Sequence, residues 1–264
     1  MPVARSPVGA IGVALLTALL THLDRARVEG QLGFLRRVAP RSRFVAVHGG
    51  KRADFEGLPA EDAVFVDDPS LRGPHFDKSL NDTLRAIHAR WVRDDPDVDL
   101  VYLAEYDHLI LRADFEDALR AVAARTGAGL VAKNATRRND TNWSHFLKVR
   151  HDERLNDYIA SITTRDDPLV RWGCLGTGLL LTRAALEAFC ALEDPPPYYV
   201  EMFVPTAIHH LGFRVVDMDA VSDLYADVRW LPEFDVHEAL AAKRAGRHFV
   251  HPFKRLEELD ALAP

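Results

Sequence analysis

The sequence has few cysteines and no cysteine motif. Its 264 residues include two cysteines, Cys174 and Cys190, and no CxxC spacing. A disulfide framework or a thiolate zinc site needs cysteines in greater number or at short fixed spacing, and neither is present. We therefore expect two reduced core residues, no nucleophilic cysteine, and a cytoplasmic protein.

A surplus of positive charge is also missing. The formal net charge is −6, and no block of lysine and arginine stands out along the chain. Nucleic-acid-binding proteins carry basic patches that neutralise phosphates, so we expect no nucleic-acid partner. The hydrophobic content of 48% and the charged content of 27% are those of a globular protein with a sizeable core.

The chain has no hydrophobic run long enough to cross a bilayer as a helix. The best candidate covers residues 8–20, which are only 13 residues behind Arg5, whereas a spanning helix needs about 20. No small-x-small cleavage site follows, and residues 21–25 lead directly into a helical pattern. We expect a buried first strand here and no transmembrane segment.

The sequence does contain an alternation of short apolar runs and longer amphipathic stretches. Such alternation predicts an α/β fold. Strands are expected at residues 11–20, 44–47, 63–66, 100–104, 129–132, 176–181, 213–216 and 249–250. Helices are expected at 25–38, 77–91, 115–125 and 201–211, with a further helix ending near residue 192, and a long polar loop at 133–167.

The most informative segment is the apolar run 100–104, which is followed by Glu105 and Asp107. Alternation along an extended chain points these two side chains to the same side. Ligands of open α/β sheets bind beyond the carboxyl ends of the strands. Two hard oxygen ligands at that edge suit a divalent cation that holds a diphosphate. The alternative is a strand that merely ends in acidic residues.

The order of elements and four short segments resemble the GT-A fold of nucleotide-sugar-dependent glycosyltransferases. The segments are residues 105–107, 176–182, 201–206 and 251–254. The resemblance implies a single GT-A-like, Rossmann-like α/β domain over residues 1–264, with a mixed, mostly parallel central sheet flanked by helices. It also implies a nucleotide-binding half at about 1–132 and an acceptor-binding half at about 133–264.

The resemblance places Asp107 directly on a cation, Mn²⁺ or Mg²⁺, with Glu105 acting through the metal's water or on the ribose. The family usually has Asp at the first of these positions, so Glu105 departs from its pattern. A histidine near the end of the chain often completes the metal site, which points to His251. Imidazole is a ligand for Mn²⁺, and the ammonium of Lys254 can neutralise a leaving diphosphate. A surface His-Pro turn is the alternative.

Glu201 occupies the place at which inverting members of the family keep their general base. Such a base takes the proton of the acceptor hydroxyl as it attacks the anomeric carbon of the sugar. The alternative is an acidic residue that favours a helix N-terminus through the helix dipole.

Four further residues are expected in the nucleotide-sugar site. Lys78 and Asn81 match a region that often touches the nucleotide or the diphosphate in this fold. Gly176 precedes an apolar run, and a glycine there lets the backbone approach a sugar ring. Trp172 is a candidate for stacking on a sugar face, with packing before a core strand as the alternative.

The implied function is transfer of a sugar from a nucleotide diphosphate sugar to a hydroxyl-bearing acceptor, which is a sugar, a lipid or a small molecule. One alternative is a sugar-phosphate nucleotidyltransferase. Those enzymes usually have a glycine-rich phosphate loop directly after the first strand, where residues 21–25 of this chain contain no glycine. The other is a catalytically inactive nucleotide-binding protein of the same fold, which Glu105 in place of Asp allows.

Overall fold

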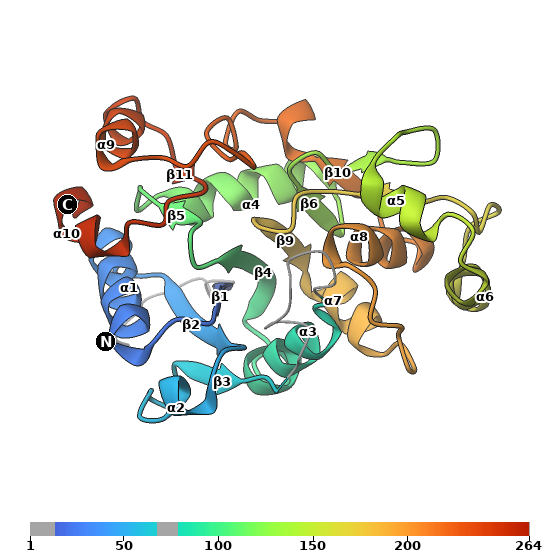
Figure 1. Cartoon of the computed structure of the whole chain (residues 1–264), viewed down its shortest axis with the longest axis horizontal. Coiled ribbons are helices and arrows are strands. Elements are labelled where there is room, and N and C mark those ends of the chain that lie inside the picture. The colour runs from blue at the N-terminus through green and yellow to red at the C-terminus, as the bar shows by residue number, and fades with distance from the viewer. Residues whose placement is uncertain (1–13, 68–78, 264) are drawn as a thin grey trace, which may run out of the picture.

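The computed structural model describes residues 14–67 and 79–263, which form a mixed α/β structure (Figure 1). The central sheet has the strand order β10-β6-β9-β4-β1-β2-β3. Its strands pair in parallel except that β9 is antiparallel to β4 and β6, so the predicted mixed, mostly parallel sheet is confirmed. The strands are β1 (Ala14–Thr21), β2 (Arg43–His48), β3 (Ala63–Phe65), β4 (Val98–Glu105), β6 (Leu130–Ala132), β9 (Leu179–Thr182) and β10 (Val215–Asp217).

Helices cover both faces of the sheet, because its central strands are apolar on both sides. Along β4, Leu100, Tyr102 and Ala104 belong to one buried cluster, and Val101 and Leu103 belong to the other. The first cluster includes residues of α1 (Arg25–Val38), α4 (Phe115–Thr126), α9 (Val236–Arg244) and α10 (Leu259–Leu262). The second includes residues of α3 (Asn81–Ile87), α6 (Glu153–Ile162), α7 (Arg183–Cys190) and α8 (Val200–His210). In the described part of the chain, no helix combines the length and the apolar character needed to cross a membrane.

Helix α1 shows why strongly patterned segments are predicted well. The Asp24 side chain accepts a hydrogen bond from the backbone N–H of Arg27 at 3.1 Å and so caps the helix N-terminus. Val28, Leu32 and Leu35 recur at helical spacing and are buried. The helix spans the predicted residues 25–38.

The predicted polar loop at 133–167 is wrong. The segment contains β7 (Thr136–Arg137), α5 (Ser144–Val149) and α6. Helix α6 begins where the Asp152 side chain accepts a hydrogen bond from the N–H of Leu155. It buries only Leu155 and Ile159, four residues apart on one face. Two apolar residues in a polar segment make a weak helical pattern, and the capping aspartate is the stronger signal.

Two other helices differ from the sequence prediction. The helix expected at 77–91 consists of α3 and a π-helical turn at His88–Val92, while residues 77 and 78 lie outside the described residues. Helix α9 is not predicted, although it begins with a capping box in which Asp235 and Glu238 accept hydrogen bonds from each other's backbone N–H. The remaining elements are α2 (Arg52–Phe55), β5 (Leu109–Ile110), β8 (Trp172–Gly173), β11 (Phe249–Val250), and 3₁₀ turns at Met218–Ala220 and Leu256–Glu258.

A small second sheet brings a late segment of the chain to the end of β4. Strands β5 and β11 are antiparallel, with Phe249 opposite Ile110 and Val250 opposite Leu109. Beyond the last pair, the backbone N–H of Phe253 donates a hydrogen bond to the carbonyl of Asp107 at 2.8 Å. The residues that follow β4 and those that follow β11 are therefore held against each other.

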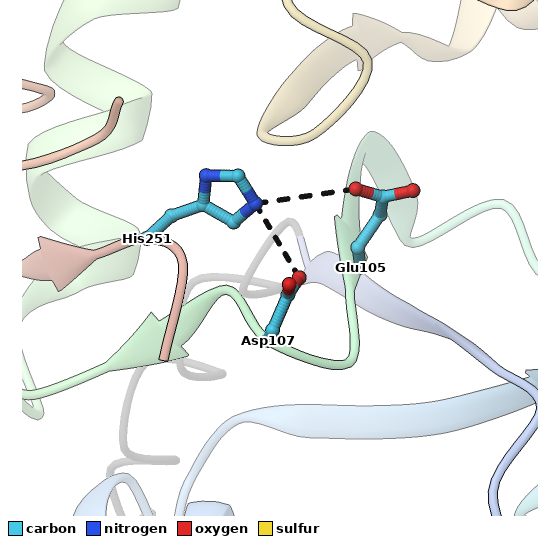
Figure 2. Close-up of side chains that lie close together, drawn as sticks. All are labelled: Glu105, Asp107 and His251. Atoms are coloured by element: carbon cyan, nitrogen blue, oxygen red, sulfur yellow. Dashed lines mark ion pairs between the residues drawn. The ribbon is translucent and has the colours of Figure 1, made fainter. Parts of the chain in front are cut away.

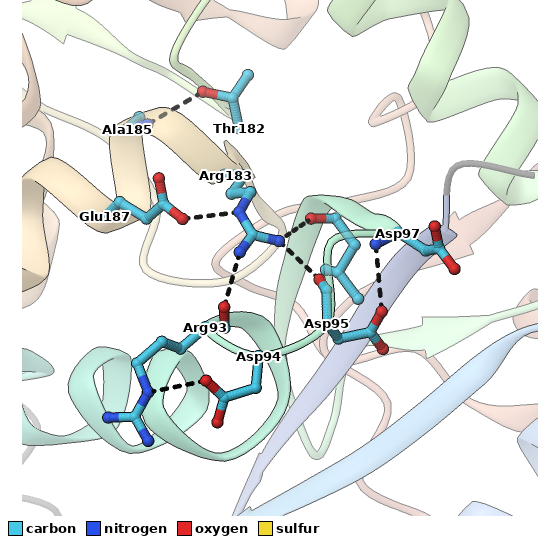
Figure 3. Close-up of polar contacts among 9 residues, drawn as sticks. Arg93, Asp94, Asp95, Asp97, Thr182, Arg183, Ala185 and Glu187 are labelled. Atoms are coloured by element: carbon cyan, nitrogen blue, oxygen red, sulfur yellow. Dashed lines mark hydrogen bonds and ion pairs between the residues drawn. The ribbon is translucent and has the colours of Figure 1, made fainter. Parts of the chain in front are cut away.

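At the beginning of β4 a different polar network ties α7 to the turn before the strand (Figure 3). The guanidinium of Arg183 donates hydrogen bonds to the backbone carbonyls of Arg93, Asp95 and Val98 at 2.6 to 3.2 Å. It also donates to the carboxylate of Glu187 at 2.7 Å. One side chain thus satisfies several carbonyls where the π-helical turn ends and β4 begins.

Candidate functional site

Three potential metal ligands meet beyond the carboxyl end of β4 (Figure 2). Glu105 ends the strand, Asp107 lies in the turn that follows, and His251 comes directly after β11. The His251 Nε2 atom is 3.3 Å from Asp107 Oδ1 and 4.0 Å from Glu105 Oε2. The structure therefore brings together the two residues predicted to bind a cation and the residue predicted to support them.

The surroundings of His251 and Asp107 suit a cation. The Asp107 side chain is buried, and among the described residues the only donor facing its Oδ1 atom is the His251 imidazole, 3.3 Å away, when that ring is protonated. The His251 Nδ1 atom lies 2.7 Å from the carbonyl of Arg229, and since a carbonyl can only accept, Nδ1 carries a proton. The lone pair of a neutral His251 is then on Nε2, facing the two carboxylates. A carbonyl partner of this kind fixes the tautomer of metal-ligating histidines.

The distances also separate the roles of the two carboxylates. Adjacent ligands of an octahedral cation are about 3 Å apart when each bond is about 2.1 Å. The 3.3 Å between His251 and Asp107 matches that spacing, whereas the 4.0 Å between His251 and Glu105 exceeds it. The residues present therefore fit a divalent cation, with Asp107 and His251 better placed than Glu105 for direct contact.

The charge state of His251 follows from the same contacts. Burial lowers the pKa of the imidazole, but the hydrogen bond and charge of Asp107 and the carbonyl of Arg229 outweigh burial, so that the pKa is raised. Without a cation, a proton on Nε2 relieves the repulsion between the lone pair and the carboxylates. A proton and a cation thus compete for one atom.

Glu201 lies in the first turn of α8, immediately beyond a loop with three prolines, and is 9% exposed. Its Oε1 atom accepts a hydrogen bond from the backbone N–H of Gly176 at 2.9 Å. Burial raises the pKa of Glu201 to about 7, the N–H of Gly176 opposes the rise, and the charge of Glu105 adds to it. A carboxylate with a pKa near neutrality is suited to accept and release a proton.

A pocket joins these groups. Four predicted residues line it, namely Glu105, Gly176, Glu201 and His251. Tyr199 and Trp230, which the sequence did not single out, line it as well. Glu201 and two members of the ligand cluster, Glu105 and His251, thus face one common space at the carboxyl edge of the parallel strands, whereas Asp107 is not among the lining residues.

The turn at residues 176–178 connects the parts of the site. Besides the bond from Gly176 to Glu201, the Thr177 hydroxyl oxygen accepts a hydrogen bond from the backbone N–H of Glu105 at 2.9 Å. The carbonyl of Gly178 accepts one from the Tyr225 hydroxyl at 2.7 Å. Gly178 has a φ of +71°, and a Cβ there would lie 3.1 Å from the Tyr225 ring, so a side chain would be strained and crowded.

A buried histidine lies behind the cluster. His108 is fully buried, with its Nε2 atom 2.7 Å from the Tyr102 hydroxyl and its ring centroid 5.8 Å from that of His251. Burial, and then the charge of His251, hold the pKa of His108 well below its ordinary value. His108 is therefore a neutral packing partner of His251, not a second charged group.

The other predicted residues have different surroundings. The Lys254 ammonium is half-exposed and lies 2.7 Å from the carboxylate of Glu233, a pairing that raises its pKa. Lys78 lies outside the described residues. The predicted contact of Lys254 with a diphosphate remains a prediction.

Asn81 and Trp172 are not among the residues that line the pocket. The amide nitrogen of Asn81 donates to the carbonyls of Pro195 and Pro196, each at 3.1 Å, and so fixes the proline loop that precedes Glu201. The Trp172 ring lies against His209, with ring centroids 5.6 Å apart. The stacking of Trp172 on a sugar face stays a prediction.

Tyr199 and Trp230 were missed because both lie outside the predicted strands and helices. Tyr199 directly precedes α8, and Trp230 lies in irregular structure before Leu231 and Pro232. The sequence signal that Trp230 offers is a tryptophan beside Leu231 and Pro232, and that signal does not say which pocket the residue joins.

No protein-family model matches the sequence, and no curated protein matches it. Among solved structures, the chain is similar to the mannosyltransferase PcManGT from Pyrobaculum calidifontis in complex with GDP-Man and Mn²⁺. The two are 17% identical with a TM-score of 0.39, and the match covers 77% of this chain. This chain spans about half the length of that protein, 54% of which is covered. A similarity of this size assigns neither a family nor an activity.

Proposed function

We propose that this protein is a GT-A-type glycosyltransferase that moves a sugar from a nucleotide diphosphate sugar to a hydroxyl-bearing acceptor. One observation carries the proposal: Glu105 and His251, which cluster with Asp107, line the same pocket as the buried carboxylate of Glu201. The pocket lies where ligands of open α/β sheets bind. Residues 1–132 would form the nucleotide-binding half and 133–264 the acceptor-binding half of one domain.

In this proposal Asp107 and His251 hold Mn²⁺ or Mg²⁺, and Glu105 supports the ion through a water or binds the ribose. A divalent cation, when bound, neutralises the charge that grows on the leaving diphosphate. Asp107 supplies the buried negative charge that such an ion requires, and the Arg229 carbonyl holds His251 in the ligating tautomer. Lys254 adds a positive charge near these groups once a diphosphate competes with Glu233 for it.

Glu201 acts on the acceptor. Its carboxylate takes the proton from the acceptor hydroxyl as that oxygen attacks the anomeric carbon. The Gly176 N–H holds one carboxylate oxygen, and the Tyr199 side chain also hydrogen-bonds the carboxylate, so that both position it toward the pocket. The pKa of about 7 means that a substantial fraction of Glu201 is ionised at neutral pH.

Thermal unfolding with nucleoside diphosphates and nucleotide sugars, each with Mn²⁺ or with EDTA, tests donor binding. A ligand at about one hundred times its dissociation constant stabilises the fold by about 2.7 kcal/mol. We expect stabilisation by one nucleotide that requires Mn²⁺. Stabilisation that is indifferent to EDTA would remove Asp107 and His251 as cation ligands, and no stabilisation by any nucleotide would reject the donor site.

The reaction products separate the proposed activity from its enzymatic rival. A glycosyltransferase, given a nucleotide sugar and Mn²⁺, releases a nucleoside diphosphate, slowly to water and faster to an acceptor. A nucleotidyltransferase instead forms pyrophosphate from a nucleoside triphosphate and a sugar phosphate. Pyrophosphate formation that depends on Asp107 would contradict the proposal.

A further inference from the structure

Trp230 is an aromatic side chain left in solvent at the pocket. It is 59% exposed, and its neighbour Leu231 is 60% exposed. Trp230 lines the pocket together with Glu201 and His251, whereas Leu231 is not among the lining residues. An exposed indole keeps a large apolar surface in contact with water, which is unfavourable unless a ligand covers that surface.

The backbone that carries Trp230 is held in place on its N-terminal side. The N–H of Arg229 donates to the carbonyl of His251 at 3.0 Å, and the N–H of His251 donates to the carbonyl of Asp227 at 3.0 Å. The Arg229 side chain donates to the carbonyl of Pro232 at 2.7 Å and lies over the ring of Phe234, 3.7 Å from its centroid. The exposure of the indole is therefore a property of an anchored segment.

The pocket next to the indole combines acidic groups with apolar ones, among them Leu175 and Val200. Glu105 and Glu201 contribute carboxylates, and Gly176 contributes backbone. A ligand that covers Trp230 must therefore present an apolar surface to the indole and hydrogen-bond donors to the carboxylates. A pyranose ring does both, because one face carries C–H groups while hydroxyls project from its edge.

We propose that Trp230 is the platform on which a sugar ring of the acceptor stacks, so that the acceptor is a glycoside or an oligosaccharide. This inference rests on the proposed transferase function. The hydroxyl that Glu201 deprotonates belongs to the acceptor, and the ring that bears it lies in the same pocket as Trp230. Glu105 and His251, which serve the donor in this proposal, line the same pocket, so the assignment of the indole to the acceptor rests on Glu201 and is tested against the donor below.

Binding in the absence of donor tests the stacking directly. The probes are the methyl α- and β-glycosides of glucose, galactose and mannose, and disaccharides of the same sugars, titrated by calorimetry and by tryptophan fluorescence. We expect at least one probe to bind and to shift the emission to shorter wavelength. Trp230→Ala should weaken that binding about tenfold or more, Trp230→Phe should weaken it less, and Leu231→Ala should not change it. Loss of the emission shift in Trp230→Phe assigns the signal to this indole among the four tryptophans.

The donor site serves as the reference that keeps the two proposals apart. In Trp230→Ala, the Mn²⁺-dependent stabilisation by a nucleoside diphosphate should persist. If the wild-type protein shows no such stabilisation, the transferase function itself fails. If it does, and either no probe binds or Trp230→Ala weakens the nucleotide sugar instead of the glycoside, the assignment of Trp230 to the acceptor is overturned.

Discussion

Polar side chains serve opposite purposes at the two ends of β4. At the beginning of the strand, Arg183 donates to three backbone carbonyls and to Glu187, so the network is satisfied within the protein. At the end of the strand, Asp107 is buried, and the one donor that faces its Oδ1 atom among the described residues is the imidazole of His251, 3.3 Å away. A satisfied buried network stabilises a fold, whereas a buried carboxylate whose partner is an imidazole can exchange the proton of that imidazole for a cation.

Replacing Asp107 tests this contrast with the largest expected effect. Asp107→Asn keeps the size of the side chain and removes the charge that a cation needs. We expect a loss of about 10³-fold in the rate of transfer, together with loss of the Mn²⁺-dependent stabilisation by nucleotide. In the cation-free protein the variant also loses the charge that pairs with protonated His251, so its melting temperature should fall at pH values at which that imidazole is charged.

The matched control for this change lies at the other end of the same strand. Asp97 is exposed and precedes β4, so Asp97→Asn should leave the transfer rate and the melting temperature unchanged. Full transfer activity in Asp107→Asn would refute the cation site.

Glu201→Gln gives the next largest effect. The amide oxygen can still accept the hydrogen bond from Gly176, so the fold should persist while the base is lost. We expect transfer to slow by about 10²-fold with the nucleotide and Mn²⁺ shift retained. A variant that retains the wild-type rate would show that Glu201 is not the base.

The pH dependence of Glu201 gives two further readouts in the same pair of proteins. Only the ionised carboxylate accepts a proton, so the wild-type rate should rise as the pH passes through about 7, while the residual rate of Glu201→Gln should not.

The stability of the protein should also depend on pH through Glu201. Its pKa is raised in the folded state, so protonated Glu201 favours the fold at low pH. That contribution is lost as the pH rises through about 7, by on the order of 3 kcal/mol. Denaturant unfolding with EDTA should therefore show that the free energy of unfolding of Glu201→Gln, relative to that of the wild type, is higher at pH 8 than at pH 5.

Replacing Arg183 should lower the stability of the protein and, unlike the replacement of Asp107, leave cation binding unchanged. Arg183→Ala leaves the carbonyls of Arg93, Asp95 and Val98 without this donor and should lower the free energy of unfolding by about 2 kcal/mol. Cation-dependent nucleotide binding should be unchanged in the folded protein. Arg93→Ala is the control, because the Arg93 side chain is exposed and pairs with Asp94 at the surface, which contributes little. A loss of cation binding without a loss of stability in Arg183→Ala would break the contrast between the two ends of β4.

The smallest effect is expected at Thr177, whose hydroxyl holds the backbone of Glu105 at the end of β4. Thr177→Val keeps the shape and removes the oxygen that accepts from the N–H of Glu105. We expect about 1 kcal/mol less stability and about tenfold weaker Mn²⁺ binding, with recovery in Thr177→Ser. Equal losses in Thr177→Val and Thr177→Ser would show that packing, and not the hydroxyl, matters here.

How far the sequence predicts this molecule depends on the range of the interactions involved. The α/β alternation and the boundaries of α1 follow from local pattern and capping, and both are confirmed. The proximity of Asp107 and His251 depends on pairing between the two-residue strands β5 and β11, and β5 is too short to show a pattern. The resemblance to a family, and not periodicity, brought those two residues together in the prediction.

The chemical environment of the predicted residues was harder to foresee. A carboxylate near a helix N-terminus is expected to have a lowered pKa, yet burial raises that of Glu201. Which strands and loops pack over a residue is set by tertiary structure, and so is the pairing of Lys254 with Glu233. Trp230 shows the same limit, because only the folded chain places this turn at the pocket.

The bridge between Val228 and His251 has a consequence for how this protein can change over evolutionary time. Residues 227–229 hold His251 through backbone contacts, and Trp230 follows directly on the same segment. In the proposed function, changes in acceptor choice would fall at position 230, whose side chain is largely exposed and lines the pocket. Insertions or deletions three residues earlier would displace His251 at the same time. New specificities in descendants of this chain should therefore arise by exchange of side chains at the tip of the segment and not by changes in its length.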